Sequence, residues 1–295
     1  MSQTKVHSEL FISKWKKLLQ DSFGYEEYMD FLIVKTLTGK KVLSYLPLLN
    51  YTDRLNTSVD DLLELSKDNH FLIRTLNGKQ TFELNEPVTM RLDIKEKTFD
   101  ELMQSSIISK CRNQIRKSKK SDLYVEIGHD ANLIDDFYKL FSKTMHGYGT
   151  PAFSKSFFEL LYEYLDVHFV VVYKDSKPIA SLVMIYDESL VWIPWAASDK
   201  DYRQFCPNHF LYMHAIMKSV EDGKETFDFG RSAYGGHTYK FKLQWGAKPI
   251  GIKIISSNES DIYLKYKFVS SIWKRIPNTI VNIIGPKLIK YLEDI

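Results

Sequence analysis

The sequence FDFGRSAYGGHTYKFKLQWGA, residues 227–247, joins an expected strand, a glycine turn and a short basic-aromatic segment in one run. Asp228 alternates with phenylalanines on either side, as in a strand with one apolar face. Gly230 and the pair Gly235–Gly236 allow backbone conformations that a side chain would exclude. The run therefore places Asp228 and Arg231 at the mouth of a strand, where we expect chemistry.

Cations and aromatic rings alternate in the second half of this run. They are Tyr239, Lys240, Phe241, Lys242 and Trp245. Such a composition suits an anionic or carbonyl-bearing ligand, because ammonium groups bind anions and carbonyl oxygens while the rings pack around them. The alternative interpretation is a strand, a loop and a turn of helix, with the aromatic rings in the core and the lysines in solvent.

Length and composition indicate a globular protein of about two domains. The chain has 295 residues, of which 44% are hydrophobic and 26% charged. Its 18 Tyr, 18 Phe and 5 Trp are more than usual, which favours a β-rich core or a substrate groove. The net charge of +3 is too small to indicate nucleic-acid binding by itself.

Residue usage also argues against several classes of protein. Two cysteines, Cys111 and Cys206, are too few for a disulfide framework, and residues 1–10 lack the apolar region of a signal peptide. No apolar run approaches the roughly 20 residues that cross a bilayer. The eight histidines are scattered without acidic or thiol ligands, so no metal site is expected. The expected location is a reducing cytoplasm.

Hydrophobic periodicity predicts a small α+β unit over residues 1–97. Its expected elements are a helix at 11–20, a hairpin of 31–34 and 42–49, a helix at 60–67, and strands at 70–76 and 88–94. A capping box at Thr98 and Glu101 then begins a long helix predicted through residue 120. In its basic end, Arg112 and Arg116 share a face suited to phosphates, and a solvated helix end is the alternative.

The rest of the chain predicts a second, larger α+β arrangement. The expected elements are a strand at 123–127, helices at 131–145 and 154–165, strands at 167–173, 179–186 and 190–197, a helix at 208–220, and strands at 227–229 and 250–256. The segment HGYGTP, residues 146–151, is expected to be an irregular exposed loop, where binding residues are common, or a plain interhelical turn. The first hundred residues repeat part of this order, which hints at a duplication.

Several stretches together resemble the FemAB-like proteins of the acetyltransferase-like GNAT superfamily, close to the group associated with exopolysaccharide export. They are KCRNQIRKSKK (110–120), MHGYGTPAF (145–153), Pro207–Asn208 opening a helix, and FDFGRS…GGHTYKFKLQWGA. The tail WKRIPNTIVNIIGPKLIKYL (273–292) is similar to the end of that group. The most specific element is GHTYKFKLQWG, residues 236–246, and the resemblance covers residues 100–295 well.

This resemblance implies an α+β fold of tandem GNAT-like mixed sheets with flanking helices, the first domain being reduced. The implied domains are residues 1–97, residues 98–260 and a basic amphipathic tail at 261–295. Characterised relatives transfer an amino acid from aminoacyl-tRNA to an amine of a peptidoglycan precursor, and others are assigned acyl transfer to sugars or polysaccharides. The implied activity is amide formation on an amine of a cell-envelope precursor, either peptidoglycan or an amino-sugar polysaccharide.

Carried over position by position, the resemblance also implies roles for single residues. Lys242 matches the family's lysine near the donor carbonyl, where an ammonium stabilises developing negative charge. Asp228 and Arg231 would orient the amine and a ligand carboxylate or phosphate. Donor binding would fall to Tyr239, Phe241, Arg203 and Asn208, and acceptor binding to His146, Tyr148, Arg112 and Arg116.

The implied donor is acyl-CoA or aminoacyl-tRNA, used as a co-substrate with no tightly bound cofactor. Acyl-CoA users of the superfamily hold a pyrophosphate with a glycine-rich loop before a helix N-terminus. Residues 203–208, RQFCPN, keep an arginine and a helix start but no glycine, which favours aminoacyl-tRNA or another donor. The basic face of 110–120 suits either tRNA or a phosphate-bearing, lipid-linked sugar or peptide acceptor.

The tail interleaves basic residues with isoleucines. This pattern is typical of a segment that contacts an anionic membrane surface, here the inner face of a membrane, and a docked helix with its basic side in solvent is the alternative. Two further hypotheses stand beside the transferase. One is a non-catalytic GNAT-like adaptor in polysaccharide assembly, and the other is an RNA-binding protein that uses residues 110–120.

Overall fold

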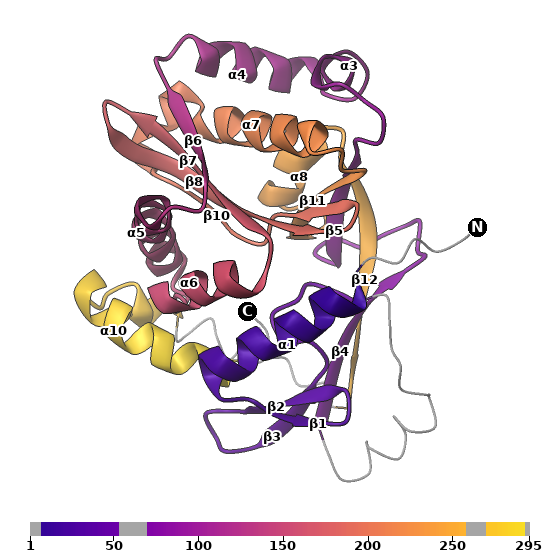
Figure 1. The fold of residues 1–295 in the computed structure, drawn as a ribbon, viewed down its shortest axis with the longest axis vertical. Helices are drawn as coiled ribbons and strands as arrows, with labels where there is room; N and C mark the ends of the chain where they lie inside the picture. The colour runs from indigo at the N-terminus through magenta and orange to yellow at the C-terminus, as the bar shows by residue number, and fades with distance from the viewer. Residues whose placement is uncertain (1–6, 53–69, 258–269, 293–295) are drawn as a thin grey trace. The chain divides into compact units, whose positions relative to one another are not determined.

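The computed structural model describes residues 7–52, 70–257 and 270–292 (Figure 1). The chain divides into two compact units, of which unit 1 comprises residues 1–76, 145–164 and 252–295, and unit 2 comprises 77–144 and 165–251. These units interleave along the chain, whereas the domains expected from sequence follow one another, and the bounds of those domains stay a prediction. The helix predicted at 60–67 lies outside the described residues.

Unit 2 is built on a mixed sheet with the strand order β12-β5-β11-β9-β8-β7-β6. β9 and β11 run parallel, the other pairs are antiparallel, and β10 also pairs with β8. The bounds are β5 (Pro87–Asp93), β6 (Tyr124–Gly128), β7 (Val167–Lys174), β8 (Lys177–Asp187), β9 (Leu190–Trp192), β10 (Ala196–Ser198), β11 (Thr226–Ala233) and β12 (Lys248–Ser256).

Strand β11 loses its partner on one side in the middle of this sheet. The sequence predicted one strand over residues 190–197, but it divides at Pro194, which has no N–H for a strand ladder. β9 pairs with β11 as far as Trp192, which lies opposite Asp228. Beyond that point Ala196 and its neighbours pair with β8 instead. The end of β11 therefore continues without β10 beside it.

The helices of unit 2 pack on this sheet. They are α3 (Phe99–Ser105), α4 (Ser109–Lys119), most of α5 (Ala131–Tyr148), the 3₁₀ helix η1 (Lys200–Phe205), α7 (Pro207–Glu221) and α8 (His237–Leu243). α7 covers β7 and β8, and α4 packs on α7 (Figure 1). Phe227, Phe229 and Trp245 are buried in the core, as expected for the apolar face of the strand at 227–229.

The helix predicted over residues 98–120 is wrong as a single element, because it breaks into α3 and α4. Its capping box is confirmed, since the Thr98 N–H donates to the Glu101 carboxylate at 2.7 Å and the Thr98 hydroxyl accepts from the Glu101 N–H. The break follows from packing: Ile107 enters the core, 1% exposed, and the N–H of Ile108 bonds the Gln244 carbonyl at 3.1 Å. Burial of the isoleucine therefore overrides the helical pattern.

Unit 1 combines a second group of strands with helices at both ends of the chain. Its strands follow the order β1-β2-β3-β4-β12, with β3 and β4 parallel. The predicted hairpin is confirmed in β2 and β3, although its second strand ends at Ser44. The bounds are α1 (Glu9–Phe23), β1 (Glu26–Tyr28), β2 (Phe31–Lys35), β3 (Lys41–Ser44), β4 (His70–Asn77), α6 (Lys155–Tyr164), α10 (Asn278–Leu288) and the 3₁₀ helix η2 (Ile289–Tyr291).

Local sequence signals fix the first helix of unit 1. The Ser8 hydroxyl accepts the Phe11 N–H at 3.1 Å, and Gly24 ends α1 in the left-handed conformation with φ of 70°. α1 then packs on α6, where the rings of Phe23 and Phe157 stack with centroids 5.6 Å apart. Both units thus show the α+β class with mixed strands and flanking helices that the sequence predicted.

Candidate active site

Asp228 is the centre of a buried polar cluster on β11. Its side chain is fully buried, and Oδ1 accepts from the Thr89 hydroxyl at 2.6 Å and from the Gly230 N–H at 2.7 Å. Oδ2 accepts from Nε of Arg91 at 3.0 Å. Thr89 and Arg91 come from β5, the neighbouring strand. The carboxylate therefore ties two strands together just where β9 stops pairing with β11.

A bulge in β11 follows this carboxylate. The register with β5 shifts between Asp228 and Arg231, and Gly230 takes a φ of 76°, which glycine adopts without strain. The bulge leaves the carbonyls of Gly230 and Arg231 in need of donors from outside the ladder. Nζ of Lys242 supplies them, at 2.9 Å from each oxygen.

Lys242 reaches these carbonyls from α8 and is itself almost completely buried, 7% exposed. Burial lowers the pKa of its ammonium to about 7, because removal from water disfavours the charged form; the nearby Asp228 opposes this shift and Arg231 adds to it. A neutral amine has two N–H groups, as many as the carbonyls that it serves. Near neutral pH the group can therefore release or accept a proton while keeping both hydrogen bonds.

Aromatic side chains enclose the base of α8. The ring of Phe241 lies edge-on to His209, with centroids 5.4 Å apart, and Tyr239 packs on Tyr234 at 4.8 Å. Burial lowers the pKa of His209 to about 4, so its imidazole is neutral at physiological pH. Within the described part of the chain, Nε2 of His209 and Nε1 of Trp245 are buried without a hydrogen-bond partner.

The turn between η1 and α7 lies between the two residues that the sequence assigned to binding of the donor phosphates. Arg203 lies in η1 and Asn208 in the first turn of α7, on either side of Cys206. Cys206 takes a φ of 55°, a left-handed conformation that glycine favours, and its Sγ donates to Oε1 of Gln114 at 2.7 Å. The segment thus makes a sharp turn of the kind that glycine usually makes, but Cys206 stands at the left-handed position and places its thiol there.

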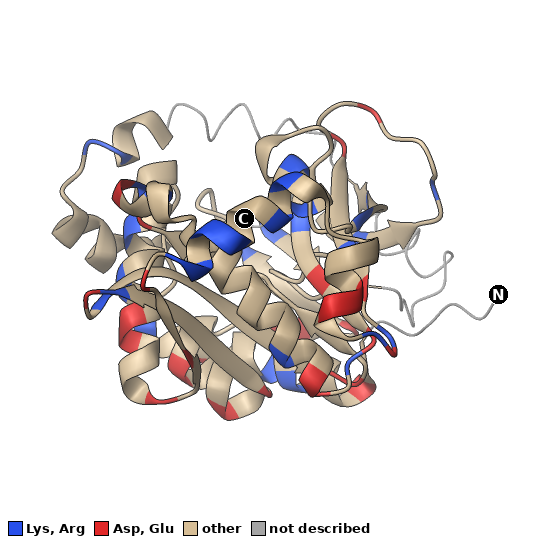
Figure 2. Cartoon of the chain, turned by 90° about the horizontal axis from the view of Figure 1, so that it is seen from above, with Lys and Arg blue, Asp and Glu red and all other residues tan. Residues whose placement is uncertain are grey.

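Cations of α4 lie close to this turn. Burial raises the pKa of Cys206 and the ammonium of Lys117 opposes that rise, while Lys110 adds to the lowering of the pKa of His209. Lys and Arg recur along α4, as Figure 2 shows from the side of this helix. The arrangement concentrates positive charge beside a helix N-terminus, where anions are stabilised.

Comparisons with known proteins agree with this architecture. The family model described as acetyltransferase (GNAT) domain matches residues 105–242. The solved structure of FemX is similar with a TM-score of 0.62 at 13% identity, over 90% of this chain and 96% of that one. The C-terminal domain of a lysylphosphatidylglycerol synthetase from Agrobacterium fabrum gives 0.59 at 10% identity, over 88% and 95%. L-PGS from Bacillus licheniformis gives 0.53 at 10% identity, over 92% and 100%. No curated protein sequence matches the chain.

Residues 105–242 match the GNAT acetyltransferase domain model, and the fold is similar to that of FemX. The resemblance read from the sequence is thereby confirmed at the level of superfamily and fold. The GNAT domain contains α4, the start of α7, the bulge of β11 and Lys242. The link to exopolysaccharide-associated relatives stays a prediction.

The two arginines of α4 that were predicted to bind the acceptor form hydrogen bonds with nearby groups of the chain. Arg112 Nη1 donates to the carbonyls of Met103, at 3.2 Å, and Ile107, where α3 ends. Arg116 Nη1 donates to Oδ1 of Asn113 at 2.8 Å and is exposed. Their acceptor-binding role stays a prediction, and the lysines of α4 are the cations that lie near the turn before α7.

His146 and Tyr148 belong to unit 1, where the structure corrects the expected loop. They form the last turn of α5, which continues to Tyr148, and the Ser270 hydroxyl donates to the Tyr148 carbonyl at 3.1 Å. An added Cβ at Gly149 would lie 2.3 Å from the Ser270 hydroxyl oxygen. The C-terminal segment therefore backs the end of α5, and the expected loop begins only at Gly149.

Three residues of the site were missed in the sequence. Thr89 and Arg91 alternate with the buried Val88, Met90 and Leu92, so period-two patterning of β5 could have placed both on one face, but not opposite Asp228. His209 was set aside because the histidines are scattered. Its contact with Phe241 depends on the packing of α7 against α8, which spacing along the chain does not show.

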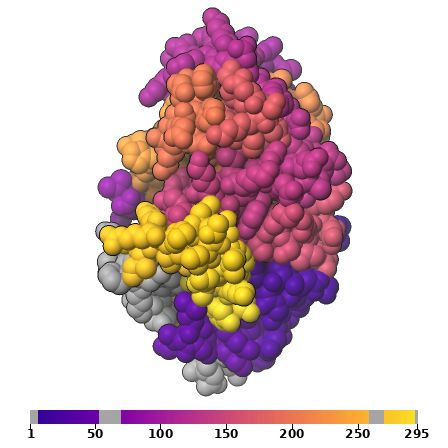
Figure 3. All heavy atoms as spheres, turned by 90° about the vertical axis from the view of Figure 1, so that its left-hand side faces the viewer, coloured from indigo at the N-terminus to yellow at the C-terminus, as the bar shows by residue number. Residues whose placement is uncertain are grey.

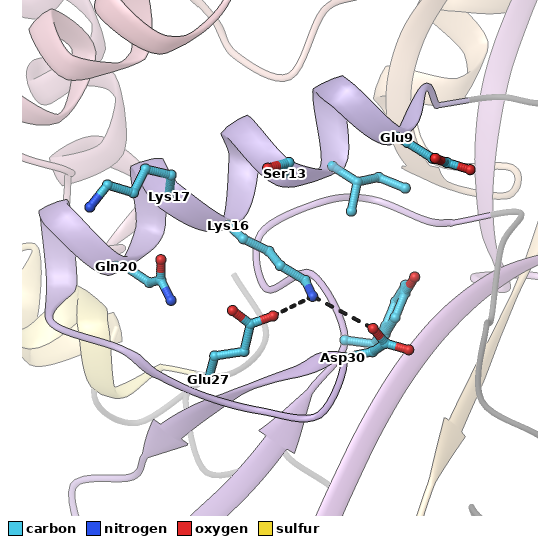
Figure 4. A pocket seen from close by; sticks show the side chains of 9 residues that line it. Glu9, Ser13, Lys16, Lys17, Gln20, Glu27 and Asp30 are labelled. Carbon is cyan, nitrogen blue, oxygen red and sulfur yellow. Dashed lines mark hydrogen bonds and ion pairs between the residues drawn. The ribbon is translucent and has the colours of Figure 1, made fainter.

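Unit 1 contains a separate polar pocket of about 440 Å³ between α1 and the β1–β2 hairpin. Lys16 projects from α1 into it and contacts Glu27 at 2.6 Å and Asp30 at 3.9 Å (Figure 4). Lys17, on the same lining, pairs with Asp21 at 2.9 Å. No sequence pattern predicted this pocket, because its groups come from segments without a motif.

Across 7–52, 70–257 and 270–292, no group of three or more His, Cys, Asp or Glu side chains is arranged to hold a metal ion. In the same residues, no helix has the length and apolar character needed to cross a bilayer.

Proposed function

We propose that the protein is an N-acyltransferase or aminoacyltransferase that forms an amide on an amine of a cell-envelope precursor, either peptidoglycan or an amino-sugar polysaccharide. The observation that carries the proposal is Lys242, a buried amine held on the part of β11 that has left β9. The GNAT domain supports acyl transfer. The fold shared with FemX and the lysylphosphatidylglycerol synthetases supports an aminoacyl group and an envelope acceptor.

The reaction requires a proton acceptor and charge stabilisation. A neutral amine attacks the carbonyl carbon of an ester or thioester, so a C–N bond forms and the C–O or C–S bond to the donor breaks. The attacking nitrogen loses a proton, and the leaving oxygen or sulfur gains one. With a pKa of about 7, Lys242 offers a lone pair in its neutral form and an ammonium for the oxyanion in its charged form.

These two roles of Lys242 give opposite pH dependences. If the neutral amine accepts the proton, kcat/KM rises as the pH passes upward through about 7. If the ammonium stabilises the oxyanion, as the family resemblance implied, kcat/KM falls over the same range. A pH profile of single-turnover transfer distinguishes the two. In either case Asp228 fixes the bulge through the Gly230 N–H, and the backbone carbonyl of Arg231 helps to hold the lysine.

Replacement of Lys242 tests the proposal directly. Lys242→Met should lower the rate of transfer on the order of a hundredfold, as for the loss of a catalytic charge or base. Lys240→Met is the matched control, because Lys240 is exposed on the same helix. The assay is transfer of a radiolabelled amino acid or acyl group to envelope amines. Full activity of the Lys242 variant would remove this residue from the mechanism.

The donor in this proposal is acyl-CoA or aminoacyl-tRNA, bound as a co-substrate. Arg203 and Asn208 at the start of α7 would contact its phosphates, and Tyr239 and Phe241 would line its acyl end. Calorimetric binding of free coenzyme A near micromolar would support acyl-CoA. No binding up to about millimolar, with binding of charged tRNA that weakens steeply as salt rises, would support aminoacyl-tRNA.

The acceptor and location complete the proposal. We assign His146, Tyr148, Arg112 and Arg116 to a lipid-linked or small sugar or peptide acceptor, with the protein in the cytoplasm at the inner face of a membrane. The alternative is a non-catalytic adaptor in polysaccharide assembly. This alternative is favoured by the turn before α7, where Cys206 replaces the glycine that would let a pyrophosphate approach the backbone. Recovery of a transfer product with any natural donor would end the adaptor hypothesis. An RNA-binding role for α4 predicts an affinity for RNA that falls steeply as salt rises. A nearly flat response of the affinity to salt would argue against that role.

A further inference from the structure

The C-terminal helix α10 is fastened to unit 1 by one face. Val281 and Ile289 are buried there, 3% and 1% exposed. Gly285 allows a close approach, since an added Cβ would stand 3.3 Å from the Ala152 nitrogen and 3.5 Å from the Trp273 ring. The helix is thus held by small and apolar groups on its inner side, and its basic residues take no part in that packing.

The opposite face of α10 is apolar as well. Ile280, Ile283 and Ile284 are 43%, 65% and 40% exposed, and their spacing of three and four residues places them on one side of the helix. Ile272, just before the helix, is 49% exposed. We call these four residues the isoleucine face. Figure 3 shows the C-terminal segment, in yellow, on the molecular surface.

This concentration of exposed isoleucine is unusual within the molecule. Six isoleucines are exposed among the described residues, and the isoleucine face holds four of them. The exposed part of such a side chain gains no stability from packing, so the group formed by Ile280, Ile283 and Ile284 indicates a surface that binds something apolar.

Charge identifies the partner. Lys274 and Arg275 precede the helix, and Lys287 and Lys290 follow the isoleucines, while residues 270–292 contain no Asp or Glu. Apolar side chains bordered by cations match a bilayer surface with anionic headgroups, where the isoleucines enter the acyl boundary and the cations meet phosphates. A second copy of the chain would instead bring the same cations together, which is unfavourable.

The length of the helix fixes how it would lie. α10 has 11 residues, which at about 1.5 Å per residue is about half the thickness of a bilayer core. It can lie in the plane of the headgroups but cannot cross the membrane. We propose that the isoleucine face, with its flanking cations, docks the protein on an anionic lipid surface. The sequence had offered a membrane segment or a docked helix as alternatives, and α10 combines both through its two faces.

The test is co-sedimentation of the full chain with vesicles of phosphatidylcholine alone and with about one third phosphatidylglycerol. Binding to the anionic vesicles is expected, with at least tenfold weaker binding to neutral ones. The triple change Ile280→Ser, Ile283→Ser, Ile284→Ser should lower binding at least tenfold. Its matched control is Ile254→Ser, an isoleucine of 40% exposure on β12.

A charge variant separates the two contributions. Arg275→Gln with Lys287→Gln should weaken binding to anionic vesicles and flatten its dependence on salt, because fewer cations meet the headgroups. Equal binding of the triple serine variant and the unchanged protein would overturn the proposal. So would a lack of vesicle binding by the unchanged protein; a dimer in light scattering that the triple change dissolves would then assign the isoleucine face to self-association. Vesicle binding does not require transferase activity. The vesicle assay can therefore contradict the docking proposal without bearing on the proposed function, and the transfer assay can contradict the proposed function without bearing on docking.

Discussion

Two ion pairs of similar length lie in very different surroundings in the two units. In unit 2, Arg91 and Asp228 meet at 3.0 Å, with side chains 18% and 0% exposed. In unit 1, Lys16 and Glu27 meet at 2.6 Å, but the carboxylate is 40% exposed. Water can replace the lysine as a partner of Glu27, whereas Asp228 has only protein donors within reach. Burial, and not distance, therefore sets what each ion pair contributes to stability.

The same contrast separates the two lysines. Lys16 pairs with carboxylates in a polar pocket, while Nζ of Lys242 donates to two backbone carbonyls inside the core. Carbonyl dipoles accept hydrogen bonds from either protonation state, but they do not replace the hydration of a full charge. A buried amine on carbonyls is therefore suited to proton transfer, and a lysine beside carboxylates to charge pairing.

Loss of the buried carboxylate should have the largest effect on stability. Asp228→Ala removes the fully buried carboxylate that accepts from Thr89, Arg91 and the Gly230 N–H, and we expect a loss of about 3–5 kcal/mol in the free energy of unfolding. Urea denaturation measures it. Asp93→Ala is the control, because that side chain is 72% exposed and pairs with Lys97 at the surface. A loss for Asp228→Ala no greater than that of the control would contradict the importance of burial for this ion pair.

The ionisation of Lys242 should give an intermediate effect that depends on pH. Its pKa is about 7 in the folded protein, against 10.5 for the free side chain. Between these values the unfolded chain binds more protons than the native one, so stability rises with pH across this window. The cost of burying the charge is complete below about pH 7 and disappears above 10.5.

Urea unfolding of the wild type and of Lys242→Met measures this cost. The stability difference between them should shift in favour of the wild type by about 2–3 kcal/mol from pH 7 to pH 9, since one pKa unit corresponds to about 1.4 kcal/mol. Lys240→Met should behave like the wild type. Parallel pH profiles for wild type and Lys242→Met would mean that the amine stays charged in the folded state.

The exposed pair of unit 1 should give the smallest effect. Glu27→Gln removes the carboxylate that contacts Lys16, and the expected change in unfolding free energy is within about 1 kcal/mol, decreasing at high salt. Lys17→Gln, which removes another surface pair on α1, is a suitable comparison. A loss as large as that of Asp228→Ala would show that distance matters more than burial here.

Much of the site was predictable because its residues are close in sequence. Asp228, Gly230, Arg231 and Lys242 all lie in one run of the sequence, and the structure joins them through the bulge. Their chemistry was only partly predicted. The family resemblance implied an ammonium near the donor carbonyl, but it did not show that this group is buried and donates to carbonyls that the bulge frees from the strand ladder. Thr89 and Arg91 come from a distant segment, and pairing between strands brings them in.

By itself, the sequence determined the superfamily resemblance, the capping box at Thr98, the strand of Phe227 and Phe229, and the mixed α+β class, because caps and periodic patterns act over a few residues. Only the tertiary structure decided where α3 and α4 break, which residues surround Asp228 and which face of α10 meets solvent. These depend on competition for burial among segments far apart in the chain, and no local pattern of residues records its outcome.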